Sequence, residues 1–298
     1  MEQEVNASES HPAIRIKNVS KQFGSHRVLD QIDTTIEPGE IVAFVGPSGC
    51  GKSTLLNCIV GTLEPTSGSI EVWNKDTDQM MSVNGPGRDR GIVYQRYSLF
   101  PHLTALQNVA FGLMLDETEP HFRWLNPFAW RKLRKAHLEK SEEILTRVGL
   151  AKAMHNYPTE LSGGMCQRVA IAQALVMRPQ ILLMDEPFGA LDEATRESLQ
   201  RLLLELYHQN QVAKEKGERP PHTIIIVTHE IEEAIFVGDR IIGLSQRGRD
   251  GNGASIVFDE AQPVFKPDDL KDSTVISQEK SKVIEAAFGS DYGQDTVS

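Results

Sequence analysis

Two kinds of hydrophobic pattern alternate along this chain. Short, wholly apolar runs occupy 41–45, 181–184 and 223–227. Runs of this length are typical of strands buried on both faces of a parallel sheet. Near the N-terminus, apolar and polar positions alternate at 14–19 and 28–36, which predicts half-buried strands ending at a Pro38–Gly39 turn. Further strands are predicted at 69–73, 91–95 and 255–258.

Segments with the hydrophobic period of a helix lie between these predicted strands. A helix is predicted at 131–148, where Gly149 stands at the expected C-terminal stop, and another at 193–209, with leucines on one face. The whole region from 96 to 174 has a helical character, and an amphipathic helix is predicted at 277–288. By contrast, 116–130 is turn-rich and aromatic, and 210–221 is predicted to be a charged loop.

Composition narrows the class of protein. The 298 residues, 40% of them hydrophobic, are enough for a substantial core, and an α/β unit of this length often forms one domain with an inserted lobe. The net charge of −10 argues against a general nucleic-acid surface. No window is long and apolar enough to span a bilayer, so we expect any membrane role to come through a partner. The polar residues 1–12 are expected to be a disordered lead-in rather than a secretion signal.

The three cysteines have neither metal-ligand nor disulfide spacing. Cys50, Cys58 and Cys166 are therefore expected to be small structural fillers in a reducing compartment. Because Cys50 falls inside a glycine-rich segment, it would make the protein sensitive to thiol reagents if it were accessible.

That segment, GPSGCGKST at 46–54, follows a predicted strand and precedes a predicted helix. Its glycines allow a tight turn whose N–H groups point at an anion, and the following helix adds its positive end. The lysine can reach the outer phosphates of a nucleotide, and the serine after it can ligate Mg²⁺. The segment predicts a nucleotide site formed by Gly46, Pro47, Ser48, Gly49, Cys50, Gly51, Lys52, Ser53 and Thr54.

Three later segments specify the family. LSGGM at 161–165, ILLMDEP at 181–187 and FGALD at 188–192 resemble, in order, the signature, Walker B and D-loop motifs of ATP-binding cassette (ABC) ATPases. The resemblance extends from about Ile14 to about Leu244. On these motifs the chain is identified as a member of that family.

The resemblance implies an α/β fold: a RecA-like P-loop NTPase core with an N-terminal antiparallel β layer and an inserted helical subdomain. The core is expected at 13–95 and 175–262 and the subdomain at 96–174, together an ATP-binding domain over 13–262. The remaining 263–298 are expected to be a tail with a short helix, too short for a domain with its own core.

The resemblance also implies catalytic roles, with ATP and Mg²⁺ as cofactors. Asp185 follows an apolar strand and would hold Mg²⁺ with Ser53, while Glu186 would be the general base. Gln95 matches the Q-loop glutamine, which contacts magnesium or water, and His229 matches the switch histidine that positions the attacking water. Taken alone, a glutamine is more often a surface amide and a histidine more often structural.

Other positions match binding elements of the family. Phe23 stands where an aromatic ring stacks on adenine, although a core phenylalanine is the alternative. The signature would open a helix and bind the ATP of a second subunit, and Asp192 would link the two halves of the dimer. Met165 replaces the family's usual glutamine, and we expect activity to survive. The residues expected to donate to the second ATP are Ser162, Gly163 and Gly164.

A subgroup is indicated by PGRDRGIVYQ at 86–95, YPTELSGGM at 157–165 and DEPFGALD at 185–192. These resemble importer motors for nitrate, sulfonate, taurine and related small anions. The resemblance implies a second ATP-binding subunit, identical or closely homologous, membrane permease subunits and, indirectly, an extracytoplasmic binding protein. It implies a peripheral position on the cytoplasmic face of the inner membrane.

Two alternatives belong to other classes. An ABC ATPase acting on nucleic acid or ribosomes would carry a long coiled coil between Gln95 and Leu161, or two cassettes, and neither is present; no nucleic-acid partner is expected. An assembly or lipid-trafficking ATPase stays open, and co-purification with a membrane partner would distinguish it.

The motifs described so far leave the role of two segments unexplained. Between Phe122 and Lys135, aromatic residues interleave with cations, which is typical of an interfacial anchor. The favoured alternative is that the aromatics pack on the helical lobe. After Gln95, the 96–104 segment is expected to line the groove where a permease helix docks, with Phe100 as an apolar anchor or, alternatively, a core residue.

Overall fold

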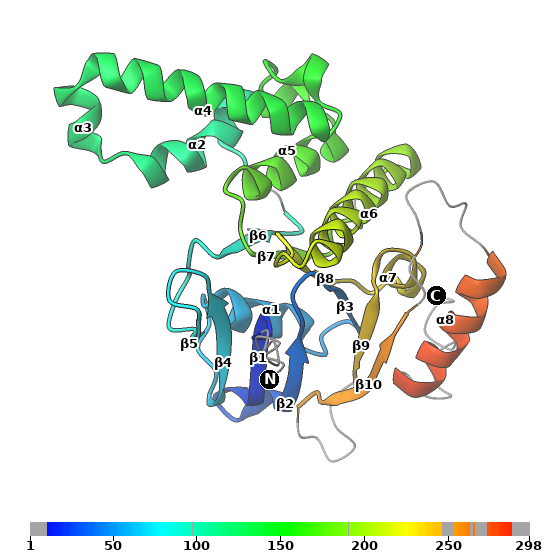
Figure 1. Ribbon diagram of the computed structural model, residues 1–298. Helices are drawn as coiled ribbons and strands as arrows, with labels where there is room; N and C mark the ends of the chain where they lie inside the picture. The colour runs from blue at the N-terminus through cyan, green and yellow to red at the C-terminus, as the bar shows by residue number, and fades with distance from the viewer. Residues whose placement is uncertain are drawn as a thin grey trace, which may run out of the picture.

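A computed structural model describes residues 11–96, 98–189, 191–245, 253–262, 265 and 273–287. Within these residues the chain forms two sheets, with helices packed beside them and a helical layer to one side (Figure 1). The expected α/β fold, with an antiparallel N-terminal layer and an inserted helical subdomain, is confirmed.

The larger sheet has six strands in the order β10-β9-β3-β8-β7-β6. Five of them are parallel, and β10 joins β9 antiparallel at the edge. The strands are β3 (Ile41–Val45), β6 (Arg90–Val93), β7 (Ile181–Asp185), β8 (Thr223–Val227), β9 (Arg240–Leu244) and β10 (Ile256–Ala261). Every residue of β3 and β8 is buried, which explains why both strands are apolar apart from Thr223.

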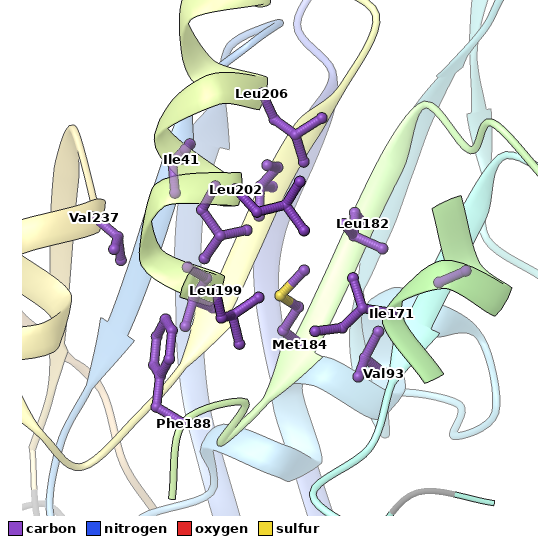
Figure 2. Close-up of a cluster of buried hydrophobic side chains, with 14 of the residues drawn as sticks. Ile41, Val93, Ile171, Leu182, Met184, Phe188, Leu199, Leu202, Leu206 and Val237 are labelled. Carbon is purple, nitrogen blue, oxygen red and sulfur yellow. The ribbon is translucent and has the colours of Figure 1, made fainter. Parts of the chain in front are cut away.

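Both faces of this sheet are covered by apolar side chains. On one face, Leu199, Leu202 and Leu206 of helix α6 (Glu193–Glu215) pack towards Leu182 and Met184 of β7 (Figure 2). On the other face lie helices and strands whose buried residues include Leu55, Leu56 and Ile59 of α1 (Lys52–Val60). Each such leucine stabilises the fold by about 1.5–3 kcal/mol of apolar burial.

The smaller sheet is antiparallel, in the order β2-β1-β4-β5. Its strands are β1 (Ile14–Phe23), β2 (His26–Ile36), β4 (Ser67–Asn74) and β5 (Gln79–Ser82). Ile14 and Ile16 are buried while Lys17 is exposed, as the alternating pattern predicts for the first part of β1. Register shifts in its pairing with β2 follow Ile16 and Val19, so the alternation is not continuous.

The helical layer contains α2 (Ala105–Glu117), α3 (Pro120–Leu125), α4 (Pro127–Arg147) and α5 (Gly163–Val176). Short 3-10 turns at Ala151–Ala153 and Pro158–Glu160 connect α4 to α5. Thr104 begins α2 through a capping box with Gln107. We propose the division of the domain near residues 95 and 175, and α5 runs slightly past the second boundary.

Two loop predictions are wrong. The 116–130 segment is largely helical, because Pro120 and Pro127 each stand at the start of a helix, where a missing N–H has no cost. The 210–221 segment continues α6 as far as Glu215, since buried Asn210 donates to the carbonyls of Gly39 and His222 and ties the helix end to the core.

The four aromatic residues of the 116–130 segment divide into two groups by exposure. Trp130 is half-buried, with its ring 6.3 Å from that of His137, and Phe122 is also partly covered. Trp124 and Phe128 are 83% and 86% exposed. The expectation that all four pack on the helical lobe is therefore wrong for these two.

The C-terminal part of the chain packs on the core. Helix α8 (Ser273–Ala287) contacts α7 (Ile231–Val237), with Ile276 and Val283 buried and Lys280 paired to Glu232 at 2.6 Å. The predicted helix at 277–288 is present but begins earlier, and its last predicted residue lies outside the described residues, as do 1–10.

Candidate nucleotide-binding site

Four neighbouring strands deliver the predicted catalytic residues to one edge of the sheet. Strands β3, β8, β7 and β6 are parallel and adjacent, so their carboxyl ends meet. The phosphate loop follows β3, His229 follows β8, Glu186 follows β7 and Gln95 follows β6. This edge is where open α/β sheets bind ligands.

The phosphate loop depends on its glycines. Gly49 and Gly51 have φ values of +78° and +110°, in the region that side chains disfavour. A Cβ at Gly51 would also lie 2.9 Å from side-chain carbons of Val28 and Leu29, so the loop packs closely on β2. The sequence therefore requires glycine here for both conformation and space.

Lys52 lies at the start of α1 and is only 6% exposed. Its Nζ donates to the carbonyl oxygens of Gly46 at 2.6 Å and Pro47 at 3.0 Å. The loop thus holds a buried positive charge beside its own backbone, which is suited to a polyanion. The arrangement can bind phosphate groups.

Ser53 and Asp185 come together across the site. The Ser53 hydroxyl donates to Oδ1 of Asp185 at 3.0 Å. Burial raises the pKa of Asp185, and the neighbouring Glu186 raises it further, while the Ser53 hydrogen bond opposes the change. A cation would relieve this concentration of negative charge.

These oxygen ligands fit Mg²⁺. Within the residues that the structure describes, no cluster of three or more His, Cys, Asp or Glu side chains could hold a metal. Mg²⁺ does not need one, because it is commonly held by one or two carboxylates together with waters and substrate phosphates. Ser53 and Asp185 bring one hydroxyl and one carboxylate together, which is compatible with this kind of binding, and Gln95 contacts the neighbouring Glu186.

Glu186 contacts side chains that follow two other strands of the sheet. Its backbone has φ +47°, unusual for a residue with a side chain, and its N–H donates to the Val227 carbonyl at 2.8 Å. Its carboxylate accepts a hydrogen bond from Gln95 Nε2 at 2.7 Å and lies 3.2 Å from His229 Nδ1. The backbone thus turns sharply after β7 and places the carboxylate between an amide and an imidazole.

His229 has a second acidic neighbour. Its Nε2 lies 3.5 Å from Oε1 of Glu230, and its side chain is 45% exposed. Thr228, which is buried, accepts a hydrogen bond from the Glu230 N–H and shapes the turn after β8. The histidine is therefore not a core residue, and it can contact a ligand at the sheet edge.

Phe23 lies at the end of β1 and is 49% exposed. The Nζ of Lys21 lies 5.0 Å from the centroid of its ring. The core alternative is therefore wrong, and an exposed ring is available for stacking. That it stacks on adenine stays a prediction.

The signature segment begins α5 as predicted. Ser162 is the N-cap residue, and its hydroxyl accepts from the Met165 N–H at 3.3 Å. A Cβ at Gly164 would lie 2.7 Å from Cγ2 of Thr195, so the first turn of α5 packs closely on the first turn of α6. Met165 is partly buried against the main core, so its side chain fills space there.

Asp192 begins α6 in the same way. Its carboxylate accepts from the Thr195 N–H at 3.0 Å and from the Thr195 hydroxyl at 2.8 Å, and these hydrogen bonds lower its pKa. Thr195 therefore joins Asp192 to Gly164. Sequence reasoning missed Thr195, although its place three residues after an Asp N-cap could have indicated its role.

The predicted residues thus form two groups. Gln95 and His229 both contact Glu186, and Ser53 contacts Asp185. Ser162, Gly164 and Asp192 form a separate group around Thr195. Among the described residues, no hydrogen bond or ion pair joins this second group to the phosphate loop.

Cys50 differs from one expectation. It is 2% exposed, so it does not offer an accessible thiol. Burial raises its pKa, although the nearby Lys52 opposes the shift. Cys58 and Cys166 are buried as well, in agreement with a structural role.

Comparisons with known proteins place this geometry in context. A family model described as "ABC transporter" matches residues 29–189. The bicarbonate transport ATP-binding protein CmpD of Synechococcus elongatus is 39% identical over 243 residues, which cover 80% of this chain and 77% of CmpD. The sulfate/thiosulfate import ATP-binding protein CysA of Pectobacterium atrosepticum is 42% identical over 232 residues, covering 77% of this chain and 63% of CysA.

Solved structures of an ABC transporter cassette are also similar to this chain. The dimeric structure of MJ0796, a bacterial ABC transporter cassette, is similar with a TM-score of 0.64 and 33% identity, covering 85% of this chain and all of that one. A dimeric post-hydrolysis state of MJ0796 with ADP and phosphate is similar with a TM-score of 0.63 and 32% identity.

Proposed function

Because this chain belongs to the ABC transporter family, we propose that it is the ATP-hydrolysing subunit of an importer for a small anion. Membership makes it an ATP-binding ATPase. The observation that carries the proposal is the cluster of Gln95, Glu186 and His229 beside a phosphate loop, in a chain about 40% identical to two importer ATPases.

We assign the chemistry to named side chains. Lys52 and the loop N–H groups bind the β- and γ-phosphates of ATP. Glu186 accepts a proton from the water whose oxygen bonds to the γ-phosphorus, while the bond from that phosphorus to the bridging oxygen breaks and ADP leaves with the electron pair. His229 and Gln95 hold the Glu186 carboxylate and the water in position for this attack. Phe23 stacks on the adenine ring.

Ser53, Asp185 and Gln95 would hold Mg²⁺. When bound, the ion neutralises charge on the phosphate oxygens. The protein's own contribution is to hold the Ser53 hydroxyl and the Asp185 carboxylate 3.0 Å apart at the start of α1, where both could serve as ligands of the ion.

The second group of residues is proposed to act on a partner subunit. Ser162, Gly163 and Gly164 lie at the N-terminus of a long helix, where N–H groups and the helix dipole attract an anion. Since no hydrogen bond or ion pair among the described residues joins them to their own phosphate loop, a second copy or a close homologue would supply the ATP that they bind. The similarity to a dimeric cassette supports this arrangement.

Import of a small anion rests on the relatives. One is named for bicarbonate and the other for sulfate and thiosulfate, which are all oxyanions. Nitrate, sulfonates and taurine have the same type of charged group and remain candidate cargoes. Permease subunits and an extracytoplasmic binding protein would select among them, since an ATPase of this kind does not contact the cargo.

The position in the cell follows from these partners. None of the described helices is long and apolar enough to cross a membrane. We propose that the subunit is peripheral, held at the cytoplasmic face of the inner membrane by its permease. An assembly or lipid-trafficking ATPase is the alternative function.

The decisive experiment is purification of the tagged full-length chain from native membranes in mild detergent. We expect an integral permease to co-purify and, in proteoliposomes, ATP-dependent uptake of one anion among bicarbonate, sulfate, nitrate and taurine. The Glu186→Gln chain, assembled with the same permease, is the matched control and should show no uptake. Recovery of assembly factors or ribosomes without a permease would overturn the proposal.

A further inference from the structure

Large apolar side chains are exposed to solvent at the junction of α3 and α4. Trp124 is 83% exposed, Leu125 62% and Phe128 86%. Figure 1 shows α3 at the edge of the helical layer, at the ends of α2 and α4 and away from both sheets. We call the following set the α3–α4 corner: Trp124, Leu125, Phe128, Arg131, Lys132 and Lys135.

The charge of this region is opposite to that of the chain. From residue 120 to residue 138 there are five Arg or Lys residues and no Asp or Glu, whereas the whole chain has a net charge of −10. Lys135 is paired to Glu139 at 3.7 Å. Within the described ranges, no ion pair neutralises Arg131 or Lys132, and both are exposed.

On α4, one aromatic ring and three cations share one helix face. Phe128, Arg131, Lys132 and Lys135 follow one another on α4 at spacings of three, four and seven residues from Phe128. Trp130 and His137 lie on another face and line an apolar hollow against α2, together with Phe111 and Met114. The exposed stripe is therefore distinct from the side of α4 that packs within the layer.

Contacts of Arg123 hold α3 against the end of α2. Arg123 donates to the Met114 carbonyl at 3.0 Å and to the Thr118 hydroxyl at 2.9 Å, and its guanidinium lies 5.5 Å from the centroid of the Trp130 ring. These contacts tie α3 to the C-terminal end of α2. Because these contacts already order the backbone of α3, binding through Trp124 would have a smaller cost in conformational entropy than binding through an unstructured segment.

We propose that the α3–α4 corner docks on the surface of an anionic lipid bilayer. Aromatic rings bind at the headgroup level, and each nearby Lys or Arg strengthens binding to anionic lipid about fivefold. The acidic remainder of the chain is repelled by the same surface. The corner would therefore also set the orientation of the protein on the membrane.

This inference goes beyond the proposed function and does not depend on it. A permease would hold the subunit at the membrane through protein contacts, whereas the corner contacts lipid directly. Lipid binding is tested without a permease or a cargo, so failure of one proposal leaves the other intact.

The test is flotation of the full-length protein with vesicles of phosphatidylcholine alone or mixed with phosphatidylglycerol. We expect binding to the anionic vesicles only. Raising the salt from about 0.1 M to about 1 M shortens the Debye length from about 10 Å to about 3 Å and should release most of the protein. The chain's three tryptophans should report insertion as a blue shift that is absent in Trp124→Phe.

Two variants of the α3–α4 corner separate the contribution of its cations to lipid binding from that of its aromatic rings. The Arg131→Gln/Lys132→Gln/Lys135→Gln chain should bind anionic vesicles roughly 100-fold more weakly, from about fivefold for each cation. The Trp124→Ala/Phe128→Ala chain should lose at least about tenfold, because both rings leave the interface. ATPase activity in solution should be unchanged in both, since these side chains are exposed and the α3–α4 junction lies away from the sheet edge that carries the nucleotide site (Figure 1).

Matched controls change the same chemistry elsewhere. Arg201→Gln/Lys214→Gln/Lys216→Gln removes three exposed cations from the α6 region, and Met81→Ala/Val257→Ala removes two exposed apolar side chains from the sheets. Neither control should change binding by more than about twofold, because these residues lie outside the interface. Equal binding to both vesicle types, no binding to either, or equal losses in controls and corner variants would each overturn the proposal. So would corner variants that bind vesicles normally but fail to bind the permease, because the corner would then be a protein interface.

Discussion

The side chains of Gln95 and Glu186, 91 residues apart, meet in a hydrogen bond of 2.7 Å from Nε2 to Oε2. Gln95 follows β6 and Glu186 follows β7, and the two strands are parallel neighbours. Any movement of the segment after Gln95 would therefore act directly on the carboxylate proposed as the base. The contact links the helical layer, which follows Gln95 in the chain, to the site of hydrolysis.

Replacing Glu186 with Gln should abolish turnover while ATP stays bound. The amide cannot accept the water's proton, and general-base catalysis contributes roughly 10²- to 10⁴-fold. Steady-state phosphate release and nucleotide-dependent dimerisation in size exclusion are the two measurements. Glu139→Gln, on an exposed face of α4, is the control. Wild-type turnover in the Glu186 variant would refute the assigned role.

Replacing Lys52 with Ala should weaken ATP binding itself. Hydrogen bonds to charged groups contribute about 1.5–3 kcal/mol, so we expect a loss of roughly 10- to 150-fold in affinity. Titration with a fluorescent ATP analogue measures it, and Lys214→Ala, an exposed cation on α6, is the control. Equal affinities for the Lys52 variant and the wild type would exclude a phosphate contact by this lysine.

Stability should depend on pH through Asp239. Burial, with the nearby Glu40, raises its pKa to about 7, and its carboxylate accepts the Ile41 N–H at 2.9 Å. The unfolded value is about 3.9. Since the folded state holds the proton more tightly, this contribution favours folding most below about pH 4 and is lost as the pH rises to about 7. The loss is at most about 4 kcal/mol.

Asp239→Asn keeps an acceptor for Ile41 but has no proton to lose. Its free energy of unfolding, from urea titrations between pH 4 and 8, should vary less with pH than that of the wild type. Asp76→Asn, an exposed carboxylate, should follow the wild-type profile. Identical pH profiles for Asp239→Asn and the wild type would contradict the raised pKa.

The native protein should react slowly with thiol reagents. All three cysteines are buried, and burial raises the pKa of Cys58 to about 11 and also raises that of Cys50. The thiolate is the reactive form, so little of it is present at neutral pH. A colorimetric thiol assay should find three cysteines in denaturant and no fast-reacting one without it. Rapid modification that inactivates the ATPase would show that Cys50 is accessible.

Phe100→Ala should impair coupling more than stability. Phe100 is 39% exposed, its ring lies 4.7 Å from that of Phe111, and its backbone is held by Asn108. A half-exposed ring should contribute less than the about 3–5 kcal/mol of a buried phenylalanine. We expect a small decrease in melting temperature, normal ATPase activity in solution and loss of permease binding. A large decrease in melting temperature would identify Phe100 as a structural residue instead.

The strands and the phosphate loop could be predicted from the sequence because each is a local pattern. Apolar runs such as 41–45 and 181–184 match the continuous burial of strands covered on both faces. The glycines of the loop are required by backbone conformation alone, as at Gly51. Family resemblance then placed Asp185, Glu186, Gln95 and His229, which no local pattern could have grouped.

The helix boundaries were predicted less well, because helix ends depend on contacts distant in sequence. The charged composition of 210–221 predicted a loop, yet α6 continues because Asn210 is buried against Gly39 and His222. The 116–130 segment was predicted to be turn-rich, yet its two prolines stand where a helix tolerates them.

The sequence by itself determined the fold class and the nucleotide loop, since these depend on periodicity and on a motif whose spacing is local. Only the tertiary structure decided which residues are exposed and which groups meet. It buried Cys50, exposed Trp124 and Phe128, and joined Gly164 to Asp192 through Thr195. Burial is a property of packing between distant segments, and a single chain segment does not encode which neighbour will cover it.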